Sequence, residues 1–274
     1  MRIAFERRSQ ALLCPAMTAG PPRVLVLEKA WQILSLFTPE QPVHDMRGIR
    51  AGAGLPPTTC TRIVHSLVAA GILAEQEGSY RIGLTVVRWA DVAIAGLDVL
   101  DAVRPMLQEL RDETGETAGF FVRQGAHRVC VAFAESRRPL GRRLTLGHLL
   151  PLNIGAPGRV LLAYDEQALQ ALRAEPLTKF TEQSIDTWPA LQRALDDVRR
   201  QGYAHSRGEW SLELAGLAAP VFAGSGELVG AVALSTPASR LGPDRLTSLR
   251  DALLRAASGM SQALPARERL RPAE

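Results

Sequence analysis

Residues 54–67 have the sequence GLPPTTCTRIVHSL, which predicts a helix that begins at the two prolines. Proline is tolerated in the first turn because its missing N–H would have no partner inside the helix. The helical spacing places four apolar side chains on one face, which we expect to be buried: Cys60, Ile63, Val64 and Leu67. The opposite face carries hydroxyls, a guanidinium and an imidazole but no acid: Thr58, Thr59, Thr61, Arg62, His65 and Ser66. Exposed faces of helices in water normally include Glu and Asp.

The flanking segments complete a small helical domain. Apolar residues at steps of three and four predict an earlier helix, ended by Thr38-Pro39, whose buried face consists of Val24, Leu27, Trp31, Leu34 and Phe37. A second helix is expected over about residues 43–52, with Met46, Ile49 and Ala53 turned inward. Residues 72–82 predict a β-hairpin that turns at Gly78-Ser79. Three helices and a hairpin form the winged helix-turn-helix arrangement.

This arrangement suits DNA for a physical reason. The third helix fits the major groove, hydroxyls and N–H groups at its start meet phosphates, and arginine can reach a phosphate or a guanine. The alternative is a helical subdomain whose polar face simply meets water.

The remainder of the chain predicts an α+β module. Helical patterns occupy residues 84–96, with Trp89 suited to a dimer seam, and residues 97–114. Strand-like pairs flank turns at Gln124-Gly125 and at residues 224–226, and helical patterns alternate with them over about residues 157–164, 189–201 and 244–264.

Composition excludes several classes of protein. The chain has 274 residues and a net charge of +4, which corresponds to roughly two domains. Its three cysteines show neither disulfide nor zinc spacing, and Cys60 and Cys130 are expected in the core. The five histidines form no i, i+4 pair, and no G-x-S-x-G motif indicates a hydrolase. We expect no catalytic residue, metal or cofactor. Residues 1–22 lack a continuous apolar run, so we expect a loose arm and a cytoplasmic location; Met17 is an alternative start to Met1.

The sequence resembles the IclR family of bacterial transcriptional regulators. That family's recognition-helix segment typically has the pattern G-L-P-K/R-S-T-V-x-R-L-L-x-x-L, similar to residues 54–67, and its wing is similar to the hairpin ending in residues 80–83. The resemblance continues in order over residues 23–263, through Leu97-Asp98, Arg104-Pro105 and the segments 113–117, 202–204, 218–222 and 234–241.

The resemblance implies a fold and domain boundaries. A winged helix-turn-helix (residues 23–83) follows the arm 1–22, a linker helix covers 84–97, a GAF- or PAS-like effector-binding domain covers 98–264, and a tail covers 265–274. Pro57 stands where the family usually has Lys or Arg, so one phosphate contact is expected to be missing, and Arg47, Arg50 and Arg81 could compensate. The candidate DNA contacts are Arg81 on the wing and the polar residues of the helix that begins at the two prolines: Thr58, Thr59, Thr61, Arg62, His65 and Ser66.

The resemblance also implies an effector pocket. Its expected lining is Leu144, Leu146, Ala156, Pro157, Ser206, Gly216, Ala233 and Ser235, beside residues 153–158, where N–H groups at a helix start can hold a carboxylate. Ser206, Gly216 and Ala233 are smaller or less polar than is frequent in the family. We therefore expect more room, fewer polar groups and an aromatic or medium-sized organic acid, with Arg142, Arg143 and Arg207 as candidate carboxylate partners.

The expected partners are double-stranded operator DNA, a small organic acid and a second copy of the chain, in dimers or dimers of dimers, with no membrane. One alternative is a ligand sensor that acts through protein contacts without specific DNA binding. The other alternative is that the protein is a hydrolase.

Overall fold

The computed structural model describes residues 24–38, 41–95, 99–138 and 144–264. The chain divides into two compact units between Gly96 and Leu97. The expected arm, the tail and the alternative starts lie outside the described residues.

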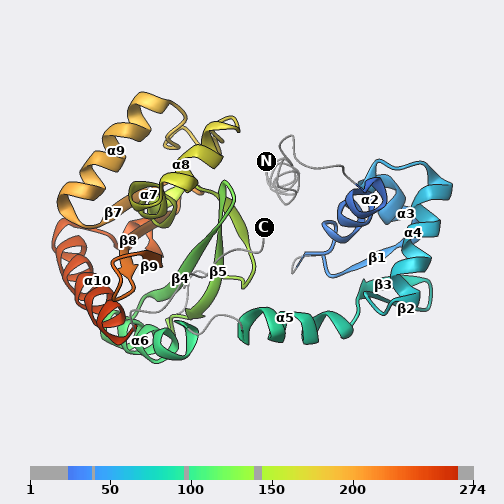
Figure 1. Cartoon of the computed structure of the whole chain (residues 1–274), viewed down its shortest axis with the longest axis horizontal. Helices are drawn as coiled ribbons and strands as arrows, with labels where there is room; N and C mark the ends of the chain where they lie inside the picture. The colour runs from blue at the N-terminus through green and yellow to red at the C-terminus, as the bar shows by residue number, and fades with distance from the viewer. Residues whose placement is uncertain (1–23, 39–40, 96–98, 139–143, 265–274) are drawn as a thin grey trace. The chain divides into compact units, whose positions relative to one another are not determined.

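The described residues of the first unit contain four helices and a three-stranded sheet (Figure 1). Its elements are α2 (Leu25–Leu34), β1 (Val43–Asp45), α3 (Met46–Ala53), α4 (Pro57–Ala69), β2 (Leu73–Gln76), β3 (Ser79–Ile82) and α5 (Thr85–Ala95). The antiparallel sheet has the order β1-β3-β2. The predicted winged helix-turn-helix is confirmed.

The core of this unit confirms the predicted inner face of α4. Cys60, Ile63, Val64 and Leu67 are all buried, and they pack with Ile33, Ile49 and the hairpin residue Tyr80. The helix starts where the sequence indicates, with Pro57 in its first turn and Gly54 in the left-handed region (φ 63°) at the end of α3.

The predicted buried face of α2 is wrong for three of its five residues. Val24, Leu27 and Trp31 are 59%, 67% and 47% exposed, whereas Ile33 is fully buried and Ala30, Leu34 and Phe37 pack beside it. Apolar residues surround this helix on more than one side, so spacing alone gave no preference between two possible stripes.

Two local details of the hairpin also differ from the prediction. The turn lies at Glu77-Gly78, whose φ angles are 54° and 75°, and Ser79 already belongs to β3. Residues 43–45 form the additional strand β1, so the second helix begins at Met46, with the Asp45 carboxylate accepting from the Gly48 N–H at 2.6 Å.

The second unit is an antiparallel sheet covered by helices. Its elements are α6 (Val99–Thr114), β4 (Thr117–Gln124), β5 (His127–Ala134), β6 (Leu149–Pro151), α7 (Gly155–Tyr164), α8 (Glu166–Arg173), α9 (Trp188–Gln201), β7 (Ala204–Arg207), β8 (Leu214–Phe222), β9 (Leu228–Pro237), the 3-10 turn η1 (Ala238–Arg240) and α10 (Pro243–Ala263). The strand order is β6-β5-β4-β9-β8-β7.

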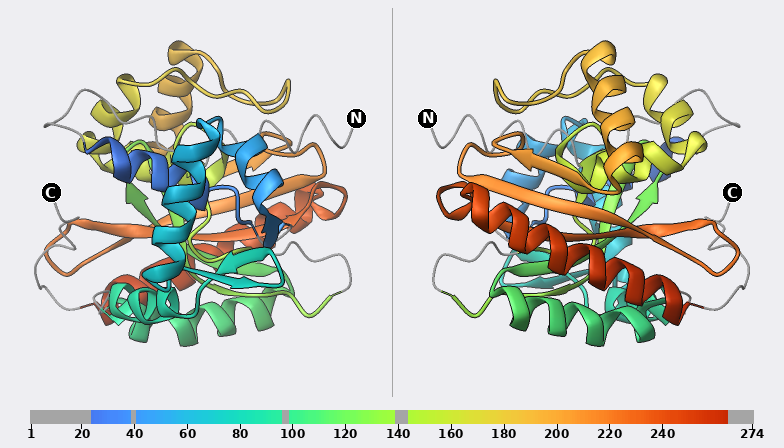
Figure 2. Two further views of the ribbon diagram at one scale, coloured as in Figure 1. Left: turned by 90° about the vertical axis from the view of Figure 1, so that its right-hand side faces the viewer. Right: turned by 90° about the vertical axis from the view of Figure 1, so that its left-hand side faces the viewer.

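Helices cover the sheet from both sides. α6 and α10 pack together on one face, and α7, with α8 and α9 beside it, packs on the other (Figures 1 and 2). The second core lies under α7, where Val160, Leu161 and Leu162 meet Leu191, Leu195 and the sheet. The predicted α+β module is confirmed, and its curvature leaves a pocket between the start of α7 and the strands.

Candidate functional site

The outer face of α4 is the first candidate site. Thr58, Arg62, His65 and Ser66 are exposed, and Thr59 and Thr61 are half-buried. No acid occurs in α4, so the face has no negative charge of its own. It can therefore approach the phosphates of a duplex without like-charge repulsion.

Two of the hydroxyls on this face already have partners. The Thr61 hydroxyl donates to the Pro57 carbonyl at 2.8 Å and accepts from Arg50 Nη2 at 2.8 Å. The Ser66 hydroxyl donates to the Arg62 carbonyl at 2.9 Å. The Arg50 contact brings a second guanidinium beside the helix.

The wing carries charge of both signs. Arg81 is exposed on β3 and donates to the side chain of Gln76 on β2. Glu75 and Glu77 are exposed on the same hairpin, and sequence reasoning did not weigh them. The positive charge available to DNA is thus concentrated at Arg50 and Arg62, with Arg47 also exposed on α3.

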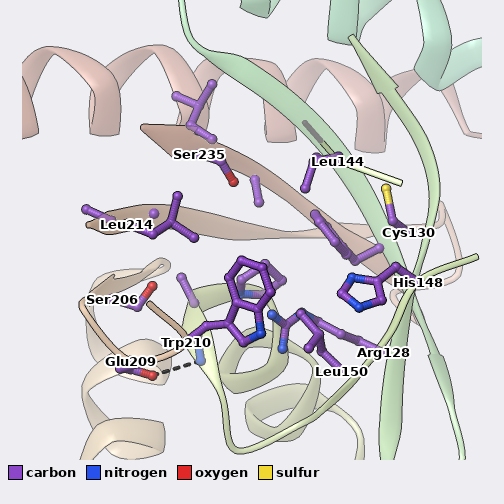
Figure 3. Close-up of a pocket in the computed structure, with 18 of the residues that line it drawn as sticks. Arg128, Cys130, Leu144, His148, Leu150, Ser206, Glu209, Trp210, Leu214 and Ser235 are labelled. Carbon is purple, nitrogen blue, oxygen red and sulfur yellow. Dashed lines mark hydrogen bonds between the residues drawn. The ribbon is translucent and has the colours of Figure 1, made fainter. Parts of the chain in front are cut away.

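The second candidate site is a pocket of about 50 Å³ in the C-terminal unit (Figure 3). Seven of the eight residues expected at an effector site line it: Leu144, Ala156, Pro157, Ser206, Gly216, Ala233 and Ser235. Leu146 does not. It lies at the corner of a turn in which His148 N–H bonds to the Thr145 carbonyl, and it is 50% exposed, while Thr145 faces the pocket.

The N-terminus of α7 is already occupied by a carboxylate of the chain itself. Glu209 Oε2 accepts from the Gly155 N–H at 2.7 Å, and Arg159 Nη1 lies 2.6 Å from Oε1 and 2.7 Å from Oε2 (Figure 3 shows the first of these bonds). Pro157, two residues into the helix, has no N–H to offer. The expectation that this helix start holds a ligand carboxylate is therefore wrong for the Gly155 and Pro157 positions.

Among the described residues, Arg128 on β5 is the arginine that lines the pocket. Its Nη1 donates to the Pro151 carbonyl at 3.1 Å and to the Ile154 carbonyl, and its guanidinium lies 5.8 Å from the centre of the Phe121 ring. Arg207, by contrast, is exposed and donates to the Leu241 carbonyl at 2.9 Å, because it lies on the opposite side of β7 from the pocket. Arg142 and Arg143 lie outside the described residues.

Sequence reasoning missed Arg128 because it placed the start of this strand at Val129. With the strand extended to His127, Arg128 shares a face with Cys130 two residues later, and both line the pocket. This alternation of side chains along β5 is the sequence signal that could have identified Arg128 as a pocket residue. Cys130 is buried as expected, 2% exposed.

The remaining wall is aromatic and hydroxylic. His148 and Trp210 meet edge to face with ring centres 6.2 Å apart, and both line the pocket with Phe121. The hydroxyls of Ser206 and Ser235 lie toward the opposite end (Figure 3). Arg128, Glu209 and Thr145, which the sequence-based prediction did not include, add further polar groups to the lining.

A metal ion and a membrane are two further partners that a protein can have. Within the described residues no group of three or more His, Cys, Asp or Glu side chains could hold a metal ion. Among the helices in that same part of the chain, none is long and apolar enough to cross a membrane.

The fold and the two sites define a class: a DNA-binding regulator in which a winged helix-turn-helix precedes a separate ligand-binding domain. Comparison with known protein families supports this class. A family model described as "Bacterial transcriptional regulator IclR C-terminal" matches residues 92–262, and one described as "IclR helix-turn-helix domain" matches residues 26–77. The chain belongs to the IclR family of transcriptional regulators, and as such it is not an enzyme.

Individual relatives agree with this assignment. The HTH-type transcriptional repressor AllR of Klebsiella pneumoniae is 30% identical over 87% of this chain and 89% of its own length. The HTH-type transcriptional regulator XynR of Escherichia coli is 28% identical over 89% of this chain and 98% of its own length. An IclR homolog from Microbacterium hydrocarbonoxydans, solved in complex with 4-hydroxybenzoate, shares the fold with a TM-score of 0.73 at 21% identity, over 87% of this chain and 98% of that one.

Proposed function

We propose that the protein is a ligand-responsive regulator that binds operator DNA as a dimer and responds to a small aromatic acid. In this proposal residues 23–83 bind DNA, residues 84–97 link the two parts, and residues 98–264 bind the effector. The DNA contacts are Thr58, Thr59, Arg62 and His65 of α4, with Thr61, Ser66 and Arg81 supporting them. The site of action is the cytoplasm, where the operator is.

The observation that carries the DNA-binding part is the exposed, acid-free face of α4 with Arg62 at its centre and Arg50 beside it. A helix of this kind presents donors to phosphates and to the acceptor atoms of guanine. If α4 instead contacted another protein, the affinity of the chain for DNA would not depend on the operator sequence.

The exposed apolar residues of the N-terminal unit support self-association. Leu27 and Trp31 on α2, and Val87, Trp89 and Val92 on α5, are each about half exposed or more. Apolar side chains of this size gain about 1.5–3 kcal/mol each when fully buried. Pairing of two such units would place two copies of α4 on one duplex, as helix-turn-helix dimers require.

The pocket supports the ligand-binding part. Its described lining combines three rings, one guanidinium and hydroxyls around a small space, which matches a compact ring that carries a carboxylate. That the Microbacterium homolog binds 4-hydroxybenzoate supports the same class of ligand. A ligand changes DNA affinity only through different affinities for two conformations, so either repression or activation follows from the same linkage.

A DNA-binding experiment with two arms tests this function. Fluorescence anisotropy compares the DNA upstream of the protein's own coding sequence with a scrambled duplex of equal length, at two salt concentrations, with and without 4-hydroxybenzoate and related benzoates. We expect tighter binding to the natural fragment, a steep loss of affinity with salt, and a shift with at least one benzoate. Equal, weak binding to both duplexes would contradict DNA-specific regulation.

A further inference from the structure

We infer that Arg50 contacts a DNA phosphate and that Thr61 is the residue that positions it. In this arrangement α3 supplies a positive charge to the polar face of α4, and the Thr61 hydroxyl holds that charge in place. The inference rests on the proposed function, because it takes the acid-free face of α4 to be the side that meets the duplex.

The Thr61 hydroxyl has no hydrogen left to give to DNA. It donates to the Pro57 carbonyl at 2.8 Å, one helical turn earlier, and it accepts from Arg50 Nη2 at 2.8 Å. A hydroxyl has a single hydrogen to donate and two lone pairs that accept. A phosphate oxygen, which only accepts, therefore finds its donor in the guanidinium that Thr61 holds and not in Thr61.

The guanidinium lies beside the polar face of α4. Arg50 is in the last turn of α3, and its bond to Thr61 spans the two helices of the helix-turn-helix. Thr58 stands three residues before Thr61 and His65 four residues after it, so the three side chains share one side of α4. Arg50 thus adds a positive charge to a surface to which α4 itself contributes Arg62.

Nothing in the described part of the chain neutralises this charge. Arg50 is exposed and bonds to the neutral Thr61 hydroxyl, and no carboxylate of the described residues forms an ion pair with it. Arg200 and Arg255, which are exposed arginines of the other unit, each pair with an acid. A guanidinium has five N–H donors, so a single bond to a hydroxyl leaves both charge and donors for a phosphate.

Both ends of the Arg50 residue are held before DNA binds. Its neighbour Ile49 is fully buried in the core, and the start of α3 is fixed by the Asp45 carboxylate, which accepts from the Gly48 N–H at 2.6 Å. Thr61 then holds the far end of the side chain. A long side chain loses rotamer freedom when it is immobilised on binding, and one that is already held loses less.

The wing is less suited to the same role. Arg81 donates to the Gln76 side chain, and the acids Glu75 and Glu77 are exposed on the same hairpin. Carboxylates beside a guanidinium reduce its attraction for phosphates, because they carry the same sign of charge as the DNA. This difference favours α3 over the wing as the source of the phosphate contact.

A purely structural role for Arg50 makes a different prediction. If Arg50 only joined α3 to α4, its replacement would lower stability and leave the salt dependence of DNA binding unchanged. Counterions are released from phosphates that a cation neutralises, so the slope of log affinity against log salt reports the contact itself. One contact corresponds to a slope of about 0.9, or about a three-fold change in affinity between about 50 and 200 mM salt.

Anisotropy titrations of full-length variants against the natural upstream fragment and the scrambled duplex test the inference. Arg50→Gln keeps a donor for Thr61 and removes the charge, so we expect a similar loss of affinity for both duplexes and a slope smaller by about 0.9. Thr61→Val removes the hydroxyl at nearly equal volume and should weaken binding to both duplexes by a smaller factor, and Thr61→Ser should restore it. Arg193→Gln, an exposed arginine variant on α9, should leave affinity and slope unchanged.

The double variant Arg50→Gln/Thr61→Val separates positioning from direct contact. If Thr61 acts through Arg50, its replacement has no further effect once the charge is gone. A full effect of Thr61→Val in the Arg50→Gln background would overturn the positioning role, because Thr61 would then contact the DNA itself. An unchanged slope in Arg50→Gln, or a loss of affinity confined to the natural fragment, would overturn the phosphate contact.

These outcomes are distinct from failure of the proposed function. A wild-type protein that prefers the natural fragment, together with an Arg50→Gln variant that keeps the wild-type slope, contradicts the role of Arg50 alone. If the wild type binds both duplexes equally, sequence-specific regulation fails, and the slope of Arg50→Gln still decides the phosphate contact. If the wild type binds neither duplex, both fail.

Discussion

Arg159 and Glu209 form an ion pair that is buried on both sides. Their side chains are 4% and 8% exposed, and two nitrogen–oxygen distances of 2.6 and 2.7 Å join them. The residues lie 50 positions apart in the chain, and the pair connects the first turns of α7 to the loop between β7 and β8. The same carboxylate accepts from the Gly155 N–H.

Breaking this ion pair should lower the free energy of unfolding. Glu209→Gln leaves the Arg159 guanidinium buried without a counter-ion, and we expect a loss of about 3 kcal/mol in the free energy of unfolding, measured by urea denaturation. Glu213→Gln, four residues away and exposed, is the matched control and should change stability little. A Glu209→Gln protein as stable as the control would mean that the pair contributes no net stability.

Arg62 should be required for operator affinity. Arg62→Ala is expected to weaken binding to the operator by about 1–3 kcal/mol if the side chain contacts a base edge through two hydrogen bonds, and to weaken binding to a scrambled duplex less. Anisotropy titrations at fixed salt measure both affinities. Arg193→Ala, an exposed arginine on α9 in the other unit, serves as the control. An unchanged operator affinity for Arg62→Ala would remove the residue from the interface.

Filling the pocket should uncouple DNA binding from the ligand. Ala233→Leu adds three carbon atoms to a side chain that is 2% exposed and lines the cavity, so we expect the response to benzoates to be lost while operator affinity without ligand is retained. The measurement is the operator affinity with and without ligand. Ala174→Leu, at an exposed position after α8, should behave as wild type. A normal response of Ala233→Leu would place the effector elsewhere.

Two histidines, the buried His127 and the half-buried His205, should make stability depend on pH. Burial lowers the pKa of His205, with the Arg159 charge acting in the same direction, and burial lowers the pKa of His127 against an opposing effect of Glu175. Each imidazole is therefore protonated more readily in the unfolded chain, where its pKa is about 6.5, than in the folded protein. The free energy of unfolding should consequently be highest above that pH and fall as the pH drops through it.

Urea denaturation between pH 7.5 and pH 5.5 checks this dependence. His127→Gln removes one of the two groups and should lose less stability over that interval than the wild-type protein does. His65→Gln, on the exposed face of α4, is the control and should follow the wild-type curve. Identical slopes for His127→Gln and wild type would show that protonation of His127 is not linked to unfolding.

The exposed tryptophans should hold two copies together. Trp31→Glu and Trp89→Glu place a charge where we expect apolar burial between protomers, so the dimer should dissociate at concentrations where the wild type stays associated. Sedimentation velocity measures the state directly. Leu212→Glu introduces the same charge at an exposed apolar position of the other unit and should have no effect. Dimers that persist in both tryptophan variants would contradict pairing through α2 and α5.

The parts of the fold that depend on neighbouring residues were predictable from the sequence. The face of α4 follows from the spacing of Cys60, Ile63, Val64 and Leu67, and the start of the helix follows from Pro57. The buried side of α2 was not predictable, because Leu27 and Ile33 are both apolar and only packing against α4 distinguishes them. β1 was missed for a similar reason: three residues form a strand only because β3 pairs with them.

The lining of the pocket was likewise predictable only in part. Family resemblance placed Ser206, Gly216 and Ala233 at one cavity, although their binding role stays a prediction. It did not indicate Arg128, Glu209 or Trp210, which come together only after β5 pairs with β6 and the loop after β7 folds over the start of α7. Charges that meet across 50 residues leave no local pattern in a sequence.

The bond between Glu209 and Gly155 has a consequence for how such a sensor can change its preference. The bond joins the loop after β7 to the helix start, and Ile154, the residue before Gly155, accepts from Arg128 Nη1 on β5. Three segments far apart in the sequence thus share hydrogen bonds at one edge of the cavity, so a substitution in one of them changes the contacts of the other two. Laboratory evolution of biosensors from this chain would do best to keep these residues and to vary the rest of the lining.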